Sequence, residues 1–584
     1  MQAVMDALNV VNGVLWHDIV LYIVLAVGVL FTVWSGFGQY HALTHGVQVI
    51  RGKYDDKHDP GAINHFQALS TALSGTVGLG NIAGVAVAVS LGGPGAVFWM
   101  WVVAAVGMMI KSTEVTLSML YRNTSDPENP HGGPMWVAAR GFEKWGLGGV
   151  GKAVGWIFCI TLIISTLTGG NMFQAWNVAK ITKTYFPSVP EPAVGIVITV
   201  LVGLVIIGGI KRIGAVTGRL VPFMCVLYLL GAFYVLAMNI GEVPAMLRLI
   251  VVSALPPFLG GESAAPAGAF LGGTFGYAFL WGMKRALFSN EAGQGSSPIA
   301  HSAAKTDEPA REGIVAGLEP FIDTIVVCTL TALVVLSSGA WNREPAAVFE
   351  NTPVMAAGPT PGTWVPLTVG VPAKDAAEAK VSQVWRANDE VFLLVKGALD
   401  EDTGRDLHKV NGTIVEEGDA LRINWTPHAS PTAPEVAGPG LHMNLTGAAL
   451  TGYAFDRVQP GMGMWIVTAA CWLFAVSTII SWYYYGEQGM IFMLGKKSVM
   501  PYKVLYCFFV FASTLPFIKT DQELDAFTAL GTGVMLFANI PIMLIFGAQA
   551  MRSYKDYTRR LRSGQMASHA APPITDVVEG KDVK

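Results

Sequence analysis

The stretch Ser70-Thr-Ala-Leu-Ser-Gly-Thr-Val-Gly-Leu-Gly-Asn-Ile-Ala-Gly84 interrupts an apolar segment that otherwise has the character of a membrane-spanning helix. Its small and polar members are Ser74, Gly75, Thr76, Gly78, Gly80 and Asn81. In hydrocarbon an unpaired backbone N–H or C=O costs several kcal/mol, so unwound backbone persists only beside a cavity or inside protein. A broken helix at mid-membrane depth therefore predicts a binding site for an ion or a small solute.

The surrounding composition is that of a membrane protein. Of the 584 residues, 52% are hydrophobic and only 14% are charged, whereas soluble domains carry about 25% charged residues. A span needs about 20 mostly apolar residues. Eleven segments meet this need, and we number them 0 to 10: 18–36, 65–90, 94–120, 153–178, 193–211, 219–239, 266–287, 312–337, 464–486, 501–518 and 525–549.

Lys and Arg residues gather in every second connection between these spans and in the segment after span 10. The alternate connections outside the long loop hold few: Lys180, Lys183, Arg248 and Lys519. We expect the protein in the cytoplasmic (inner) membrane. By the positive-inside rule, its N-terminus is expected outside and its C-terminus in the cytoplasm. The first apolar stretch lacks a basic leader, so no cleavable signal peptide is expected.

A second interruption, Gly272-Gly-Thr-Phe-Gly276, falls in span 6. Spans 1 and 6 would then be the two broken helices, each opening a block of five spans. Because five is odd, the blocks would have opposite orientations, which is the inverted repeat of many transporters. Gly residues that only pack helices together are the alternative explanation. The expected parts are an extra N-terminal helix and loop (1–64), a first repeat (65–240), the start of the second (241–341), an insertion (342–441), the rest of the second (442–550) and a cytoplasmic tail (551–584).

The insertion at 342–441 is acidic and rich in proline, and it is expected outside the membrane. Short runs at 364–371, 391–396 and 421–425 alternate as strands do, and Asn411-Gly412 is a turn signal. We expect a small β-rich unit, with disorder as the alternative for 342–362 and 426–440.

Enzyme and ATPase motifs are absent from the sequence, which contains no GxSxG, GxxxxGK[ST], HExxH or CxxC pattern. The five cysteines are scattered through apolar segments, which argues against a disulfide framework or a metal site. We expect no enzyme activity, no organic cofactor and no nucleic-acid partner. Transport, if this is the function, would have to be driven by an ion gradient.

Several motifs resemble the alanine/glycine:cation symporter (sodium:alanine symporter) family. They are the 70–84 stretch, Leu91-Gly-Gly-Pro-Gly95, Gly132-Gly-Pro-Met135, Phe288-Ser-Asn-Glu-Ala-Gly-Gln-Gly-Ser296, Pro298-Ile-Ala-His301, Pro320-Phe-Ile-Asp-Thr324 and Ser477-Thr-Ile-Ile-Ser-Trp-Tyr-Tyr-Tyr-Gly-Glu487. The resemblance implies an all-α polytopic protein of the LeuT-type fold, in the amino acid–polyamine–cation transporter superfamily. It also implies Na⁺-coupled uptake of a small neutral amino acid, alanine, glycine or D-alanine, with protons used by some members.

In the LeuT-type fold, span 8 lies against span 1, so the resemblance places Ser477 and Thr478 beside the first break. Sodium prefers oxygen ligands, which unwound carbonyls supply without a net charge. We therefore expect a sodium site built from the carbonyls of Ser74, Val77 and Phe474 and the hydroxyls of Ser477 and Thr478. The alternative is that these hydroxyls only bond carbonyls of their own helix.

An amino acid is a zwitterion, so both of its charges need partners. Backbone N–H groups at the start of a helix attract a carboxylate, which predicts Gly78, Leu79 and Gly80 as its ligands. The ammonium is expected at carbonyls of the second break, with Phe275 as a wall of the side-chain pocket. The predicted substrate residues are Thr76, Gly78, Leu79, Gly80, Asn81, Gln174, Gly273, Thr274, Phe275 and Gly276.

Charged and titratable residues inside the spans stay open to two interpretations. Lys111 and Glu114 are three residues apart, which favours a simple helix-stabilising pair. Asp323 and Glu319 could carry a driving proton, or Asp323 could simply accept hydrogen bonds from neighbours. Glu291 is a candidate for an inner gate, whereas His65 and His301 are expected to be isolated.

Three functions remain. A sodium symporter is the main expectation, a proton-coupled carrier is the alternative, and a solute sensor on a transporter fold is the third.

Overall fold

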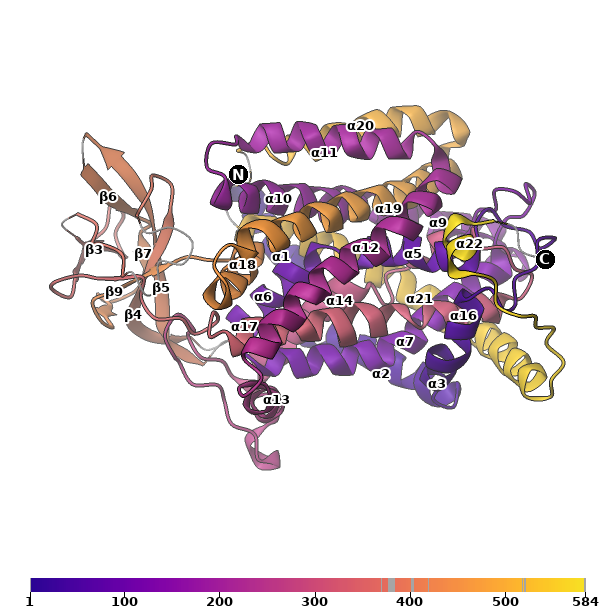
Figure 1. Ribbon diagram of the computed structural model, residues 1–584, viewed down its shortest axis with the longest axis horizontal. Helices are drawn as coiled ribbons and strands as arrows, with labels where there is room; N and C mark the ends of the chain where they lie inside the picture. The colour runs from indigo at the N-terminus through magenta and orange to yellow at the C-terminus, as the bar shows by residue number, and fades with distance from the viewer. Residues whose placement is uncertain are drawn as a thin grey trace.

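The computed structural model describes residues 2–368, 370–375, 384–400, 404–418, 420–516, 518 and 521–581. Long helices form a bundle, with a β-rich unit at one end and the C-terminal helix α22 at the other (Figure 1). The N-terminus lies at the same end as the β-rich unit. The chain therefore crosses the bundle an odd number of times between its two ends.

The helices before the middle of the chain are α1 (Gln2–Leu15), α2 (Asp18–Trp34), α3 (Gln39–His41), η1 (Ala42–Gly46), α4 (Val47–Ile50), α5 (His65–Thr76), η2 (Gly80–Gly84), α6 (Val85–Gly92), α7 (Gly95–Tyr121), α8 (Pro134–Glu143), α9 (Gly148–Leu167), η3 (Thr168–Met172), α10 (Phe173–Tyr185), α11 (Glu191–Ile206) and α12 (Gly209–Met238). Those that follow are α13 (Val243–Val252), η4 (Pro257–Leu259), α14 (Phe275–Asn290), α15 (Ser297–His301), α16 (Pro309–Ala316), η5 (Phe321–Cys328), α17 (Thr329–Ser337), α18 (Gly447–Val458), η6 (Gly463–Val467), α19 (Thr468–Leu494), η7 (Lys496–Ser498), α20 (Val499–Ala512), α21 (Asp521–Arg562) and α22 (Ile574–Glu579).

Within the described residues, six helical segments are long and apolar enough to cross a membrane, and two bent pairs raise the number to eight. The protein is thus a multi-pass membrane protein. α11 and α20 are apolar but shorter, with 16 and 14 residues, and they lie side by side along one edge of the bundle (Figure 1). Each of the eleven predicted segments contains a helix, although the count of eleven spans stays a prediction.

The first predicted break is confirmed. α5 ends at Thr76, and the helix that resumes at Gly80 is bent by 50° from it. Val77 leaves the helical region with ψ 82°. All residues from Ser74 to Gly84 are buried in protein, as unwound backbone in a membrane requires.

The second break is not at 272–276, and this prediction is wrong. Thr274 is the N-cap of α14, its hydroxyl accepting from the Tyr277 N–H, so the glycines before it belong to a loop that starts a helix rather than interrupting one. The interruption lies further along the chain, at 291–296, between α14 and α15. Glu291, Gly293 and Gly295 there have positive φ of 54°, 87° and 79°, which ends the helix.

The insertion contains strands, as predicted. They are β1 (Ala347–Val348), β2 (Val354–Ala357), β3 (Thr363–Leu367), β4 (Glu390–Asp400), β5 (Arg405–Glu417), β6 (Ala420–Trp425), β7 (His428–Ala429), β8 (Glu435–Val436) and β9 (Gly440–Met443). One antiparallel sheet has the order β1-β9-β4-β5-β6, with β8 also on β4, and a smaller one has the order β2-β3-β7. The turn expected at Asn411-Gly412 is wrong, because Asn411 pairs with Phe392 in mid-strand.

Arg405, the first residue of β5, joins the insertion to the helices. Its guanidinium donates to the carbonyl of Leu91 near the end of α6. It also lies 4.7 Å from the centre of the Tyr277 ring on α14. One buried cation therefore holds the β-rich unit against the ends of two helices.

Replacing Arg405 with alanine should remove this anchor. Hydrogen bonds from charged groups contribute about 1.5–3 kcal/mol, so Arg405→Ala should lower the thermal midpoint of the purified protein. Arg422→Ala is the matched control, because that arginine pairs with Glu417 on the exposed face of β6. Equal midpoints for the two variants would contradict the anchoring role.

Candidate functional site

A small cavity lies at the first break. It has a volume of about 10 Å³, the room of one water molecule. Its walls come from the first break, α9–α10, the second break, α19 and α21, and the residues are Gly75, Thr76, Gly78, Gly80, Ser165, Gly169, Gln174, Phe288, Glu291, Gln294, Trp482 and Thr532. Four predicted substrate residues, Thr76, Gly78, Gly80 and Gln174, are among them.

Two of the backbone N–H groups predicted to bind a carboxylate are occupied by side-chain amides. The Gly78 N–H donates to Asn81 Oδ1 and to the Thr76 carbonyl, each at 2.9 Å, and the Leu79 N–H donates to Gln174 Oε1 at 3.1 Å. An amide oxygen is the same kind of acceptor as a carboxylate oxygen. Side-chain oxygens of the protein itself thus lie at the position predicted for the carboxylate.

Asp323 connects the first break to α14. Its Oδ1 accepts from Asn81 Nδ2 at 2.6 Å, and its Oδ2 accepts from the hydroxyls of Ser289 at 2.8 Å and Thr324 at 2.7 Å. The carboxyl group is fully buried. The hydrogen bond from Thr324 agrees with the alternative that Asp323 simply accepts hydrogen bonds from its neighbours. The hydrogen bond from Asn81 also connects Asp323 to the first break.

The residues predicted for sodium come together where α5 packs against α19. The Thr478 hydroxyl donates to the Ser74 carbonyl at 2.9 Å, and the Ser74 hydroxyl donates to the Ser477 carbonyl at 2.7 Å. The Ser477 hydroxyl donates to the Phe474 carbonyl within its own helix, whereas that of Thr478 crosses to α5. Val77, buried, follows directly after α5. The own-helix alternative thus holds for Ser477 but not for Thr478.

Four predicted substrate residues lie elsewhere. Gly273, Thr274, Phe275 and Gly276 surround the start of α14, at the end of the bundle where Arg405 of the insertion binds. The Phe275 ring packs edge-on against Trp99, with ring centres 5.9 Å apart, and Gly276 is exposed. Their prediction as substrate residues depended on a break at 272–276, whereas the break lies at 291–296.

Sequence reasoning missed the second half of the cavity wall. Glu291 and Gln294 come from the actual break and Phe288 from the last turn of α14 before it, and Trp482 donates to the Gly75 carbonyl at 3.3 Å. The signal was present in the run Asn290-Glu-Ala-Gly-Gln-Gly295, which combines glycine and polar residues as the first break does.

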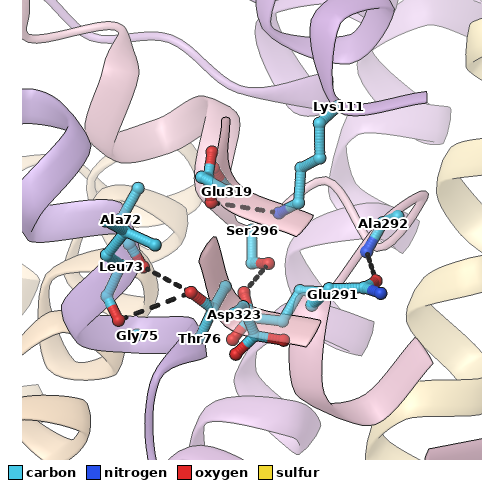
Figure 2. Close-up of polar contacts among 12 residues, drawn as sticks. Ala72, Leu73, Gly75, Thr76, Lys111, Glu291, Ala292, Ser296, Glu319 and Asp323 are labelled. Carbon is cyan, nitrogen blue, oxygen red and sulfur yellow. Dashed lines mark hydrogen bonds and ion pairs between the residues drawn. The ribbon is translucent and has the colours of Figure 1, made fainter. Parts of the chain in front are cut away.

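Buried charges lie behind this second break. Lys111 Nζ lies 3.7 Å from Glu114 Oε1, as its spacing predicted, and also 3.5 Å from Glu319 Oε2, which it faces in Figure 2. His65 and His301 are not isolated, because both contact the carboxylate of Glu312. In the described part of the chain, no group of three or more His, Cys, Asp or Glu side chains is arranged to hold a metal ion.

The chain is similar in sequence to several known proteins. The model of the sodium:alanine symporter family matches residues 1–370 and 432–571. The sodium/alanine symporter AgcS of Methanococcus maripaludis is 34% identical over 513 residues, 87% of this chain and 89% of that protein. The putative sodium/proton-dependent alanine carrier protein YrbD of Bacillus subtilis is 30% identical over 562 residues, covering 96% and 93%. The solved structure of MhsT in complex with L-phenylalanine has a TM-score of 0.48 and 13% identity, covering 85% of this chain and 93% of that one.

Gly78 tests how tightly the first break is packed. A Cβ at this position would lie 2.5 Å from Thr478 Oγ1 and 3.2 Å from Gln174 Oε1. Overpacking of this kind costs about 1–3 kcal/mol, so Gly78→Ala should lower the thermal midpoint of the purified protein. At Gly276 a Cβ meets open space, so Gly276→Ala should leave the midpoint unchanged or raise it slightly. A midpoint for Gly78→Ala as high as that of Gly276→Ala would refute the close packing.

Proposed function

Because this chain belongs to the sodium:alanine symporter family, as its motifs predicted, we propose that it carries alanine, and other small neutral amino acids such as glycine or D-alanine, into the cell together with sodium. The observation that carries the proposal is the contact of α5 with α19 beside the first break. There the Thr478 hydroxyl and the Ser74 carbonyl meet at 2.9 Å in fully buried surroundings. The names of AgcS and YrbD also support sodium and alanine as the cargo.

The sodium ion would bind among oxygen atoms of the two helices. The proposed ligands are the carbonyls of Ser74, Val77 and Phe474 and the hydroxyls of Ser477 and Thr478. The Ser477 and Thr478 hydroxyls now donate to carbonyls, and a small rotation of each would turn an oxygen lone pair toward a cation between the helices. Such a site needs no charged ligand, because the C-terminal end of α5 carries partial negative charge.

The amino acid would bind in the cavity at the two breaks. Its carboxylate would displace the oxygens of Asn81 and Gln174 from the N–H groups of Gly78 and Leu79. Gly80 and Thr76 complete this side. The ammonium would face Glu291 and Gln294 of the second break rather than the earlier candidates at 273–276. Phe288 and Trp482 narrow the cavity, which favours a small side chain.

The proposed arrangement in the membrane follows from the two ends of the bundle. The insertion and the N-terminus lie at one end and the C-terminus at the other (Figure 1). Together with the distribution of Lys and Arg, this supports an N-terminus outside, eleven spans and a cytoplasmic tail in the cytoplasmic membrane. The 5+5 inverted repeat with an added first helix, and the domain limits given above, belong to the same proposal.

The sodium site can be tested by uptake of alanine into proteoliposomes. An inward sodium gradient should accelerate uptake, and Thr478→Val should raise the sodium concentration for half-maximal uptake by about tenfold or more, which corresponds to about 1.4 kcal/mol. Thr199→Val is the matched control, since its hydroxyl bonds only the Gly195 carbonyl within α11. Uptake that is equal with and without the gradient would refute sodium coupling.

In the alternative of a proton-coupled carrier, Asp323 is the group that would bind the driving proton. The name of YrbD includes protons, and Asp323 is a buried carboxyl group whose hydrogen-bond donors Asn81, Ser289 and Thr324 are neutral. Glu319 is a weaker candidate for the group that carries the driving proton, because the cationic Lys111 and the ring of His301 already lie beside its carboxylate.

A pH step without sodium separates the two drivers. Under the main proposal, an inward pH gradient alone gives no accumulation of alanine in the wild-type protein. Accumulation that ignores sodium and disappears in Asp323→Asn would establish the proton carrier instead. Binding of alanine with no flux under either gradient would identify a sensor.

A further inference from the structure

His301 has both ring nitrogens directed at carboxylates. Nδ1 lies 2.5 Å from Glu312 Oε1, and Nε2 lies 2.8 Å from Glu319 Oε1. All three side chains are fully buried. The other oxygen of Glu312 contacts His65 Nδ1.

Proton counting shows that this arrangement holds an additional proton. A neutral imidazole has one N–H, and an ionised carboxylate can only accept. With a neutral histidine and two carboxylates, one of the two contacts would place two acceptors against each other. The second contact therefore needs a proton, either on the imidazole or on one of the carboxyl groups.

We propose that Glu312, His301 and Glu319 form a proton-binding site that fastens the start of α5 to α15 and α16 and so keeps the inner end of the protein closed. The proton is a bound ligand of the closed state. The site does not depend on whether sodium or another ion drives transport.

The position of the site supports this role. His65 is the first residue of α5, which carries the first break and the Ser74 carbonyl. His301 is the last residue of α15, which follows the second break. Glu312 lies in α16 and contacts both histidines. Separation of α5 from α16 must break the His65–Glu312 contact, so the site connects both broken helices at their inner ends.

Other titratable groups surround the site on every side. From α7, Lys111 lies 3.5 Å from Glu319 and 3.7 Å from Glu114. From the segment before α5, Asp55 lies 3.9 Å from His65 Nε2. Further charged or titratable groups near the site or its neighbours include His45, Arg122, Glu291, Arg311, Asp323, Tyr485 and His569.

The charges and hydrogen bonds around His301 favour binding of the additional proton. Burial lowers the pKa of His301, but the hydrogen bonds to Glu312 and Glu319 and their negative charge outweigh it and raise the pKa to about 9. An exposed histidine titrates near about 6.5. A raised pKa in the closed state means that the contribution to closure is complete below about pH 6.5 and is lost as the pH rises through about 9. Alkaline pH on the inner side should therefore open the protein.

A reporter cysteine can measure this opening without any transport assay. Ser70→Cys lies on α5, one turn and a half after His65, at a position that is 3% exposed. The half-buried Cys225 and Cys507 are changed to serine. The protein is reconstituted in vesicles, and a membrane-impermeant thiol reagent is applied from the inner side between about pH 7 and pH 9.

Because opening would release one proton and the range ends at the pKa of the closed state, the open population should rise about five- to sevenfold per pH unit over this range. Thiol reactivity itself changes with pH, so each rate is divided by that of the same reporter in Glu312→Gln. A glutamine there offers an N–H₂ donor and a carbonyl acceptor, which satisfy neutral histidines without an added proton. The ratio of the labelling rate in the parent to the rate in Glu312→Gln should therefore rise steeply with pH.

Glu308→Gln is the matched control. It makes the same charge change near the start of α16, but Glu308 pairs with Arg560 at 2.6 Å, away from the histidines. Its pH profile should equal that of the parent. Glu319→Gln is the second test variant in case Glu312→Gln does not fold, because its amide N–H can donate to Nε2 of a neutral His301 while Nδ1–H donates to Glu312. Its pH dependence should match that of Glu312→Gln. A constant ratio in the parent, or equal slopes in the parent and both test variants, would overturn the proton site, whatever the outcome for alanine uptake.

Discussion

The structure depends on the need to satisfy backbone polar groups where water is excluded. After Val77 the helical hydrogen-bond ladder stops, and the N–H groups of Gly78 and Leu79 do not donate to carbonyls four residues back. Asn81 and Gln174 supply acceptors from their side chains, and the Thr76 carbonyl is a second acceptor for Gly78. The unwound segment is thus stabilised by side chains of the protein itself.

The same constraint explains the buried carboxylate of Asp323. Its three donors come from the first break, from α14 and from its own segment η5. One side chain thereby fixes the position of Asn81, which in turn fixes Gly78. Buried polar networks of this kind are costly when incomplete, so a change in the last turn of α14 is felt at the first break. The network therefore holds the first break to the helix that ends at the second.

Sequence alone was sufficient for the first break, because glycines and polar residues rarely gather inside an apolar run unless the helix is unwound there. It was insufficient for the second, since Gly272 and Gly273 have the same local appearance as Gly293 and Gly295, and only the cap at Thr274 distinguishes a helix start from an interruption. The α5–α19 contact came from the family resemblance and not from spacing. The link between His65 and His301 could not be predicted, because Glu312 joins segments that are far apart in the chain, and no local pattern reports such a distance. Asn411-Gly412 misled because strand pairing with β4 overrides the local turn preference.

The insertion has its two ends side by side, since Ala347 pairs with Leu441 across β1 and β9. Residues 371–431, which carry β4 to β6, lie outside the family match. A segment whose entry and exit meet in one short ladder can be gained or lost in evolution without changing the separation of the helices it joins. The β-rich unit can therefore change in length and sequence without moving the helices that carry the two breaks.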